Sequence, residues 1–216
     1  SQEFKNPNGV PIDSMLFGAR RQRRVPLVYE ARDWQHGTFL ASTLSSETTA
    51  AATGKVGVLR RDPMAMLPFC GYNMADYFAH WLEVGKALKH APKIFRVNWF
   101  RTNDQGKFIW PGFGDNLRVL QWVLERCEGR GKALDTAIGF TPTLDAINRE
   151  GLTLSDNVMK ALLKVDAAEW VEAIAGQEDF LKSYGRRMPK AMWDEHEALA
   201  RRIDGKVTAA TAPIAD

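Results

Sequence analysis

Apolar positions follow two different spacings along this 216-residue chain. In the first half, short apolar runs separated by Gly, Pro, Asn or Asp are typical of strands. They predict strands near residues 25–31, 38–44 and 56–59. They also predict an aromatic-rich hairpin within residues 93–110, which turns at the Asn-Asp-Gln-Gly sequence of residues 103–106 and returns as a strand over residues 107–110.

Other segments show the three-to-four-residue spacing of amphipathic helices. Two such helices are expected in the first 130 residues. The first begins after Asn73, and the second begins at Asp115 or Asn116 and runs to about Cys127. Their apolar stripes are Tyr77, Phe78, Trp81 and Leu82 in the first helix, and Leu117, Leu120, Val123 and Leu124 in the second.

The last third of the chain is expected to be helical, with helices that begin at Ser155, Asp166 and Pro189. Residues 129–151 are rich in loop-forming types and are expected to be mostly loop. We therefore predict an α/β fold: a mixed sheet with flanking helices and a helical C-terminal layer. Residues 1–150 would form the first portion, and residues 151–216 would form the helical layer.

The composition is that of a globular protein, with 45% hydrophobic and 25% charged residues. A net charge of +3 is too small to indicate a nucleic-acid partner. Cys70 and Cys127 are far apart in sequence, so we expect no disulfide framework and a cytoplasmic location. No apolar run approaches the roughly 18 residues of a membrane span. The chain starts with Ser1 and a polar stretch, which we take as the interior of a longer, monomeric protein.

Four arginines lie within five residues, at Arg20, Arg21, Arg23 and Arg24. Their positive charge suits phosphate groups. A basic run of this kind is nevertheless more often a solvated loop. His36 lies in an expected loop and is assigned packing or hydrogen bonding rather than catalysis.

The most distinctive segment covers residues 93–118 and reads KIFRVNWFRTNDQGKFIWPGFGDNLR. Phe100, Phe108 and Phe113 could enclose a flat ring, and Asn116 could hydrogen-bond the edge of a base. Free N–H groups at the start of the following helix favour an acceptor-rich or anionic ligand. On chemistry alone, the ordinary packing of these aromatics in a core is the better supported of the two interpretations.

The aromatic segment contains the motifs VNWFR and KFIWPGFGDN. The rest of the chain contains GVPIDSMLFGARR, VPLVYEA, WQHG, SETTAAATG, RRDPMAMLPFCGYN and PKIF. These motifs, and the order in which they stand, resemble the GTP-dependent phosphoenolpyruvate carboxykinase family. The resemblance is strong from Gly9 to about Asn116 and weaker in the helical tail. It implies the C-terminal part of an enzyme of gluconeogenesis that interconverts oxaloacetate and GTP with phosphoenolpyruvate, GDP and carbon dioxide. The fold would be part of that enzyme's nucleotide-binding domain.

The resemblance also implies a guanine pocket. Three aromatic side chains would enclose the base, the segment after them would read its edge, and one arginine would contact the nucleotide. These residues are Phe100, Phe108 and Phe113 for the ring, Phe113, Gly114, Asp115 and Asn116 for the edge, and Arg20 for the nucleotide, with Arg21 as a weaker candidate. Ala19 stands where the family more often has Gly, which leaves the shape of this loop open.

The small polar segment from Ser46 to Lys55 resembles the lid that closes over the family's active site and excludes water from a reactive enolate. The lid residues are Ser46, Glu47, Thr48, Thr49, Ala50, Ala51, Ala52, Thr53, Gly54 and Lys55. Some relatives carry an Arg immediately before this segment, where this chain has Ser45. We expect the lid to be disordered because its upstream partners are missing.

The phosphate-loop signature GxxxxGK[ST] is absent, and no His or Cys spacing is typical of a metal site. In the family, the phosphate loop, the manganese ligands and the residues that hold oxaloacetate lie upstream of this region. We therefore expect GTP or GDP as substrate and Mn²⁺ bound outside this chain. We expect no catalytic or metal-binding residue within it, and no activity from it alone.

Two other functions stay open. The chain could act alone as a weak guanine-nucleotide-binding module without catalysis, because the aromatic pocket is present and the phosphate loop is not. It could also bind single-stranded nucleic acid, because aromatics interleaved with arginines stack on bases. The modest net charge and the family resemblance both argue against nucleic acid as the partner.

Overall fold

The computed structural model describes residues 2–49 and 57–211. The first elements are β1 (Ser14–Gly18), β2 (Val28–Glu30), α1 (Trp34–Ser42), β3 (Ser45–Glu47), β4 (Leu59–Arg61) and α3 (Met74–Ala87). They are followed by β5 (Lys93–Val97), α4 (Asn116–Cys127), β6 (Ala133–Thr136) and β7 (Gly139–Pro142). The last are α5 (Asp156–Leu163), α6 (Ala167–Lys182) and α7 (Lys190–Thr211). The predicted mixed α/β fold is confirmed.

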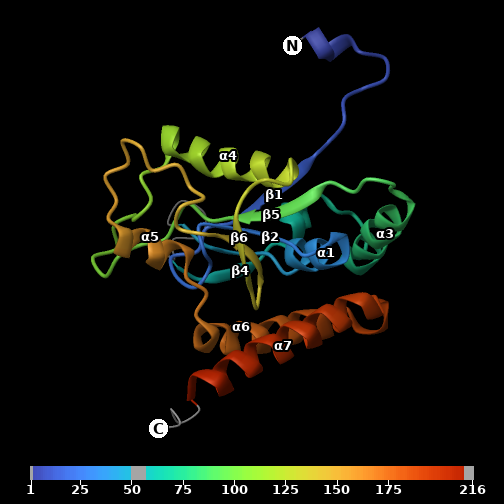
Figure 1. Ribbon diagram of the computed structural model, residues 1–216. Coiled ribbons are helices and arrows are strands. Elements are labelled where there is room, and N and C mark those ends of the chain that lie inside the picture. Colours follow the sequence, from blue (N-terminus) through green and yellow to red (C-terminus); the bar gives the residue numbers. More distant parts are fainter. Residues whose placement is uncertain (1, 50–56, 212–216) are drawn as a thin grey trace.

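A five-stranded mixed sheet lies at the centre of the molecule, in the order β1-β5-β2-β7-β6 (Figure 1). β1 and β5 are parallel, whereas β2 runs antiparallel to both β5 and β7. β6 and β7 form an antiparallel hairpin at one edge. β3, which contains the first residues of the expected lid, pairs with β4 in a separate two-stranded ladder.

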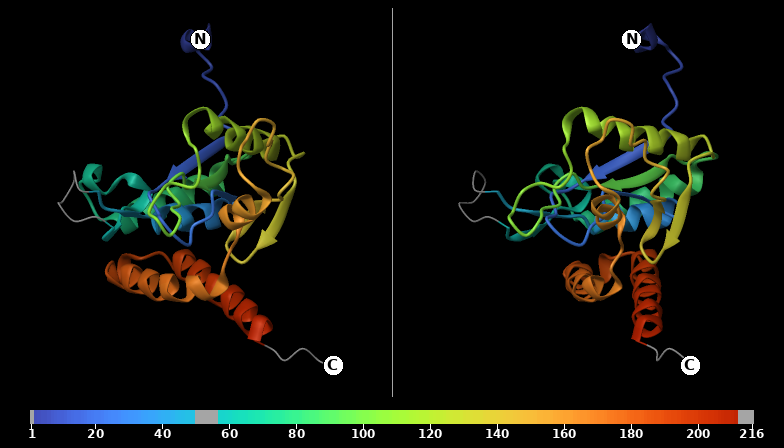
Figure 2. Two further views of the ribbon diagram at one scale, coloured as in Figure 1. Left: turned by 90° about the vertical axis from the view of Figure 1, so that its left-hand side faces the viewer. Right: turned by 60° about the vertical axis from the view of Figure 1, so that its left-hand side comes forward.

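Helices cover both faces of the sheet. Figure 1 shows α4 on one side and the α6–α7 pair on the other, and Figure 2 shows these layers from two further directions. Because successive side chains of a strand point to opposite faces, Ile94 and Phe95 enter different cores. Ile94 packs with residues of α1, α3, α6 and α7. Phe95 packs with residues of α4 and α5.

Three of the expected helix starts are confirmed by side-chain caps. The side chains of Asn73, Ser155 and Asp166 accept hydrogen bonds from backbone N–H groups in the first turns of α3, α5 and α6. The last helix, α7, begins immediately after Pro189, as expected. These starts were predictable because a cap satisfies donors that the helix itself cannot.

The strand predicted over residues 38–44 is wrong, because residues 34–42 form α1. The side chain of Asp33 caps this helix by accepting from the His36 N–H group, so His36 lies in a helical turn rather than in a loop. Residues 36–42 are all buried, and a helix buried on all sides lacks the polar face that periodicity detects. Gly37 permits this burial, since a Cβ there would lie 2.5 Å from Ile94 Cδ1.

Three further expectations about strands are corrected. The returning strand at residues 107–110 is wrong, because in the described structure an isolated bridge between Thr102 and Phe108 replaces a ladder between the two arms of the hairpin. The expected loop at residues 129–151 contains β6 and β7. The strand expected at 56–59 starts at Leu59, and Val56 lies outside the described residues. Short edge strands such as β6 depend on pairing with partners that are distant in sequence, which local patterns do not record.

The apolar stripe predicted for α4 lies mostly on its exposed side. Leu117, Leu120 and Leu124 are exposed, whereas Val119, Trp122 and Val123 are buried. Trp122 sets this orientation, because its ring packs edge-on against Phe95 and its Nε1 donates to the Lys132 carbonyl. The larger buried area of the tryptophan outweighs that of the leucines.

A buried carboxylate joins three elements of the sheet and its cover. Glu30 of β2 accepts from Lys93 Nζ of β5 at 2.6 Å and from Arg126 Nε of α4. Glu30 is buried, while Lys93 and Arg126 keep part of their side chains in solvent. The two cations compensate the cost of removing the carboxylate from water.

We expect Glu30→Gln to lower the free energy of unfolding by about 3 kcal/mol, because it leaves two cations beside a neutral group. Urea denaturation followed by circular dichroism measures this change. The matched control is Glu83→Gln, which breaks an exposed pair with Lys86 and should cost less than about 1 kcal/mol. Equal losses in the two variants would contradict a structural role for Glu30.

His36 makes the stability depend on pH. Burial, with the nearby positive charges of Arg202 and Arg32, lowers the pKa of His36 to about 3. Its Nδ1 accepts a hydrogen bond from the Arg32 backbone N–H group, so the ring is neutral in the folded chain. The unfolded chain therefore takes up a proton between about pH 6.5 and pH 3 that the folded chain does not.

We expect His36 to cost about 2 kcal/mol of stability between pH 7 and pH 5, because acid favours the unfolded state in this window. Urea denaturation at the two pH values measures the loss. His36→Gln keeps an acceptor for the Arg32 N–H group and should remove the His36 contribution. His90→Gln, at an exposed site, should not. An unchanged pH dependence in His36→Gln would show that another group is responsible.

Candidate functional site

One buried asparagine positions the arginine loop against the aromatic segment. Asn98 follows β5 and is 1% exposed. Its side-chain oxygen accepts from the backbone N–H groups of Arg21 and Phe100, both at 3.2 Å. Its amide donates to the carbonyls of Arg21 and Val25, both at 2.9 Å. The sequence analysis did not single out Asn98, although an Asn directly after a buried strand is a typical position for such bonds.

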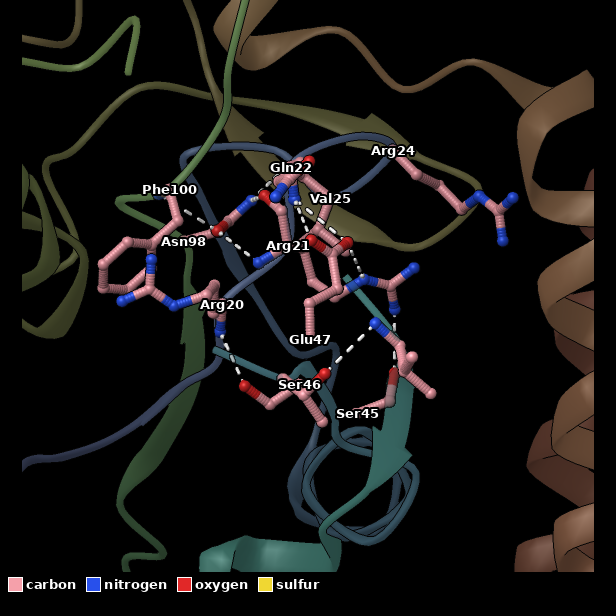
Figure 3. Close-up of polar contacts among 12 residues, drawn as sticks. Arg20, Arg21, Gln22, Arg24, Val25, Ser45, Ser46, Glu47, Asn98 and Phe100 are labelled. Carbon is pink, nitrogen blue, oxygen red and sulfur yellow. Dashed lines mark hydrogen bonds and ion pairs between the residues drawn. The ribbon is translucent and has the colours of Figure 1, made fainter. Parts of the chain in front are cut away.

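The other side of the arginine loop is held by β3 (Figure 3). Ser46 Oγ accepts from the Arg20 N–H group at 3.2 Å, and the Glu47 N–H group donates to the Arg20 carbonyl at 2.9 Å. The Glu47 carboxylate accepts from the Gln22 N–H group, and Arg21 donates to Ser45 Oγ at 2.8 Å. The base of the expected lid and the arginine loop therefore form one hydrogen-bonded unit.

The structure brings together three of the predicted nucleotide-binding residues. The guanidinium carbon of Arg20 lies 4.1 Å from the centre of the Phe100 ring and 6.0 Å from that of Phe108. The two rings are 5.9 Å apart and nearly perpendicular. Phe108 remains 58% exposed, so part of this aromatic surface is open to a ligand. Stacking of a guanidinium on an aromatic face is favourable and orients both groups.

Phe113 is placed differently. Its side chain is 95% exposed, and within the described part of the chain no ring contact joins it to Phe100 or Phe108. Gly112 has φ 77° and ψ −161°, a conformation restricted to glycine, and Phe113 follows with φ 47°. Exposure of this large apolar side chain to solvent is unfavourable, and so is its left-handed backbone conformation. Backbone strain of this kind concentrates at functional sites.

The remaining edge-reading candidates lie at the start of α4. Gly114 has open space where a Cβ would be. Asp115 pairs with Arg118 at 2.7 Å and gives α4 no side-chain cap. Asn116 Oδ1 accepts from Trp110 Nε1 at 2.8 Å, which leaves its amide N–H₂ group for other partners. Backbone atoms and this amide are therefore the polar groups that the segment presents.

The lid residues are described only at their N-terminal end. Ser46 and Glu47 belong to β3, and Thr48 exchanges backbone hydrogen bonds with Val58 and Gly57. Thr49 follows directly. The expected disorder is wrong for Ser46 and Glu47, because both pair with β4. The other predicted lid residues, Ala50, Ala51, Ala52, Thr53, Gly54 and Lys55, lie outside the described residues.

The site does not fit a resident metal ion. Over residues 2–49 and 57–211, no three His, Cys, Asp or Glu side chains come close enough to hold one. Cys70 and Cys127 are both free thiols.

None of the described helices is both long and apolar enough to cross a membrane.

Comparison with known proteins identifies the family. The family model described as the phosphoenolpyruvate carboxykinase C-terminal P-loop domain matches residues 1–202. The chain belongs to this family. The resemblance carried by the VNWFR and KFIWPGFGDN motifs is therefore confirmed, although the phosphate-loop signature itself is absent from the sequence.

Three bacterial relatives, each named phosphoenolpyruvate carboxykinase [GTP], illustrate the similarity. The protein of Treponema pallidum is 50% identical over 97% of the chain, but the match covers 35% of that relative. The protein of Corynebacterium kroppenstedtii is 51% identical over 93% of the chain and 33% of the relative. The protein of Anaeromyxobacter dehalogenans is 47% identical over 92% of the chain and 33% of the relative. The chain thus spans about a third of the length of the curated relatives it matches.

We expect Asn98→Leu to destabilise the chain by at least about 3 kcal/mol, because it leaves several buried backbone groups without partners. Hydrogen exchange should show faster opening of residues 20–25 in particular, which urea denaturation alone would not reveal. Asn157→Leu, at an exposed position of α5, is the matched control and should leave both measurements nearly unchanged. Unchanged exchange at residues 20–25 in Asn98→Leu would contradict the positioning role.

Proposed function

We propose that this chain supplies the guanine-recognition and lid portion of a GTP-dependent phosphoenolpyruvate carboxykinase. The full-length protein would convert oxaloacetate and GTP to phosphoenolpyruvate, GDP and carbon dioxide. The cluster of Arg20, Phe100 and Phe108 carries the proposal, because Arg20 is distant in sequence from both phenylalanines and yet meets them at an exposed aromatic surface. Identity of about 50% to carboxykinases named for GTP supports it.

The base would bind between Phe108 and Phe113. Arg20 already covers one face of Phe100, so the exposed rings of Phe108 and Phe113 are the free stacking surfaces. Closure of Phe113 over a guanine would remove its ring from water and offset its strained backbone. Arg20 would direct its remaining N–H groups toward the nucleotide phosphates.

Discrimination against adenine would come from the start of α4. Guanine presents the acceptor O6 where adenine presents an N6 amino donor. The backbone N–H group of Gly114 would donate to O6, and on adenine it would face a donor instead of an acceptor at that position. The amide of Asn116 is oriented by Trp110 and would contact the same edge.

The chemical step would need residues outside this chain. We propose that Mn²⁺, the phosphate loop and the groups that hold oxaloacetate or phosphoenolpyruvate belong to the other two thirds of the protein. The described residues offer no site for the metal. The proposed full-length enzyme is cytoplasmic and monomeric, and the isolated chain is inactive.

The second candidate function is a stand-alone guanine-binding module. The observation in its favour is a clustered aromatic surface in a chain whose sequence contains no phosphate-loop signature. In that case guanosine would bind as well as GTP, because the phosphates would contribute little.

We expect the chain to bind GTP weakly, with a Kd in the range of about 1 mM, because most phosphate contacts are missing. Isothermal titration with GTP and ATP, each with and without Mn²⁺, measures this affinity. GTP should bind more tightly than ATP, and Mn²⁺ should have no effect. Phe113→Ala should abolish binding, whereas Phe69→Ala, the matched exposed phenylalanine away from the site, should not.

Equal binding of GTP and ATP, or undiminished binding by Phe113→Ala, would contradict the proposed pocket. A comparison of guanosine with GTP separates the two candidates, since equal affinity favours the stand-alone module. Turnover of oxaloacetate and GTP by the pure chain would contradict the proposal that the catalytic groups lie elsewhere.

A further inference from the structure

A polar cavity lies on the face of the sheet that α6 covers. Its volume is about 330 Å³, at the lower end of the range for small-molecule sites. The cavity is lined by four arginines from three different parts of the chain and by polar groups of α6. The lining includes Arg21, Arg24, Arg61, Arg96, Trp170 and Gln177.

Arg96 is the deepest of these cations. It belongs to β5, is 3% exposed and points to the same face of the sheet as Ile94. Its Nε and Nη2 atoms have no hydrogen-bond partner among the described residues. A buried guanidinium with unsatisfied donors is costly, so a partner that is not part of the described chain would stabilise it.

The surrounding charges are unbalanced. Glu47 lies 3.5 Å from Arg21, and Glu172 lies 2.6 Å from Arg24. Within residues 2–49 and 57–211, neither Arg61 nor Arg96 forms an ion pair. Arg61 instead donates to the Thr43 carbonyl at 3.3 Å and lies over the Phe180 ring.

The excess positive charge is visible in the pKa values of the cluster. Burial, followed by the charge of Arg96, lowers the pKa of Arg21 to about 10. The same two causes lower the pKa of Arg61. An anion between these side chains would relieve the repulsion.

Uncharged groups add a specific pattern to this field. Trp170 Nε1 is a buried donor without a partner in the described structure, and Gln177 Oε1 is a buried acceptor without one. Several donors and a single acceptor match an oxyanion that still carries a proton. Inorganic phosphate keeps a proton at neutral pH, whereas sulfate and most phosphate monoesters do not.

We propose that this cavity is a binding site for inorganic phosphate, with Arg61 and Arg96 as its principal ligands. Paired guanidinium N–H groups match the spacing of phosphate oxygens, and the Trp170 N–H group would donate to a third oxygen. The Gln177 carbonyl would accept the proton of the phosphate.

This site goes beyond the proposed guanine pocket and does not depend on it. Figure 3 shows Arg20 against Phe100 on one side of the arginine loop, while Arg24 extends in the opposite direction. None of Arg24, Arg61 and Arg96 is among the predicted guanine contacts. Failure of one proposal therefore leaves the other standing.

The test is titration of the chain with inorganic phosphate by calorimetry, beside sulfate at matched ionic strength. We expect phosphate to bind more tightly than sulfate. Arg61→Gln should weaken phosphate binding by about tenfold or more, because it removes a charged donor pair. Arg60→Gln is the matched control, since it removes the same charge from the neighbouring exposed residue, and it should change the affinity by less than about twofold.

Trp170→Phe provides a second variant that keeps an aromatic ring and removes the N–H donor, and it should weaken phosphate binding several-fold. Circular dichroism verifies that each variant is folded. Phe113→Ala should bind phosphate like the wild type, which separates this site from the guanine pocket. No saturable phosphate binding, equal binding of sulfate, or equal losses in Arg60→Gln and Arg61→Gln would overturn the proposal.

Discussion

The hydrogen bonds of Asn98 are the constraint on which the candidate site depends. This side chain satisfies four backbone groups at once and ties the arginine loop to the segment that carries Phe100. The β3 strand closes the loop from the other side through Ser46 and Glu47. Because Arg20 is held between these two anchors, its guanidinium can rest on Phe100 instead of moving freely in solvent. The base of the lid and the aromatic surface are thereby parts of one rigid unit.

Buried charged groups differ between the two faces of the sheet in whether they have partners. On the α4 face, Glu30 is fully compensated by Lys93 and Arg126 and serves as a structural link. On the α6 face, Arg96 remains partly unsatisfied within the described structure. A buried charge that is paired holds the elements of its partners together. A buried charge without a partner is costly, and binding of an oppositely charged ligand would lower that cost.

The sequence predicted features that rest on local chemistry. Capping residues such as Asn73, Ser155 and Asp166 marked helix starts correctly, and the motifs around Phe100 and Phe113 indicated the family. Features that rest on tertiary packing were missed. α1 was taken for a strand because it is buried on all sides, and the exposed face of α4 was misjudged because Trp122 dominates its orientation. Asn98, Arg61 and Arg96 were also missed, since only the folded sheet shows what surrounds them. The roles of the predicted guanine-pocket residues stay predictions.

Chemical-shift mapping of the chain during titration with GDP tests the central claim most directly. The account predicts that the largest shifts fall on Arg20, Phe100, Phe108 and residues 112–116, with a marked change at Phe113 as its ring leaves water. Smaller shifts should follow at Asn98 and β3, which hold the loop. Shifts confined to other surfaces, or an unchanged Phe113 at saturating GDP, would contradict a guanine site built on this aromatic cluster.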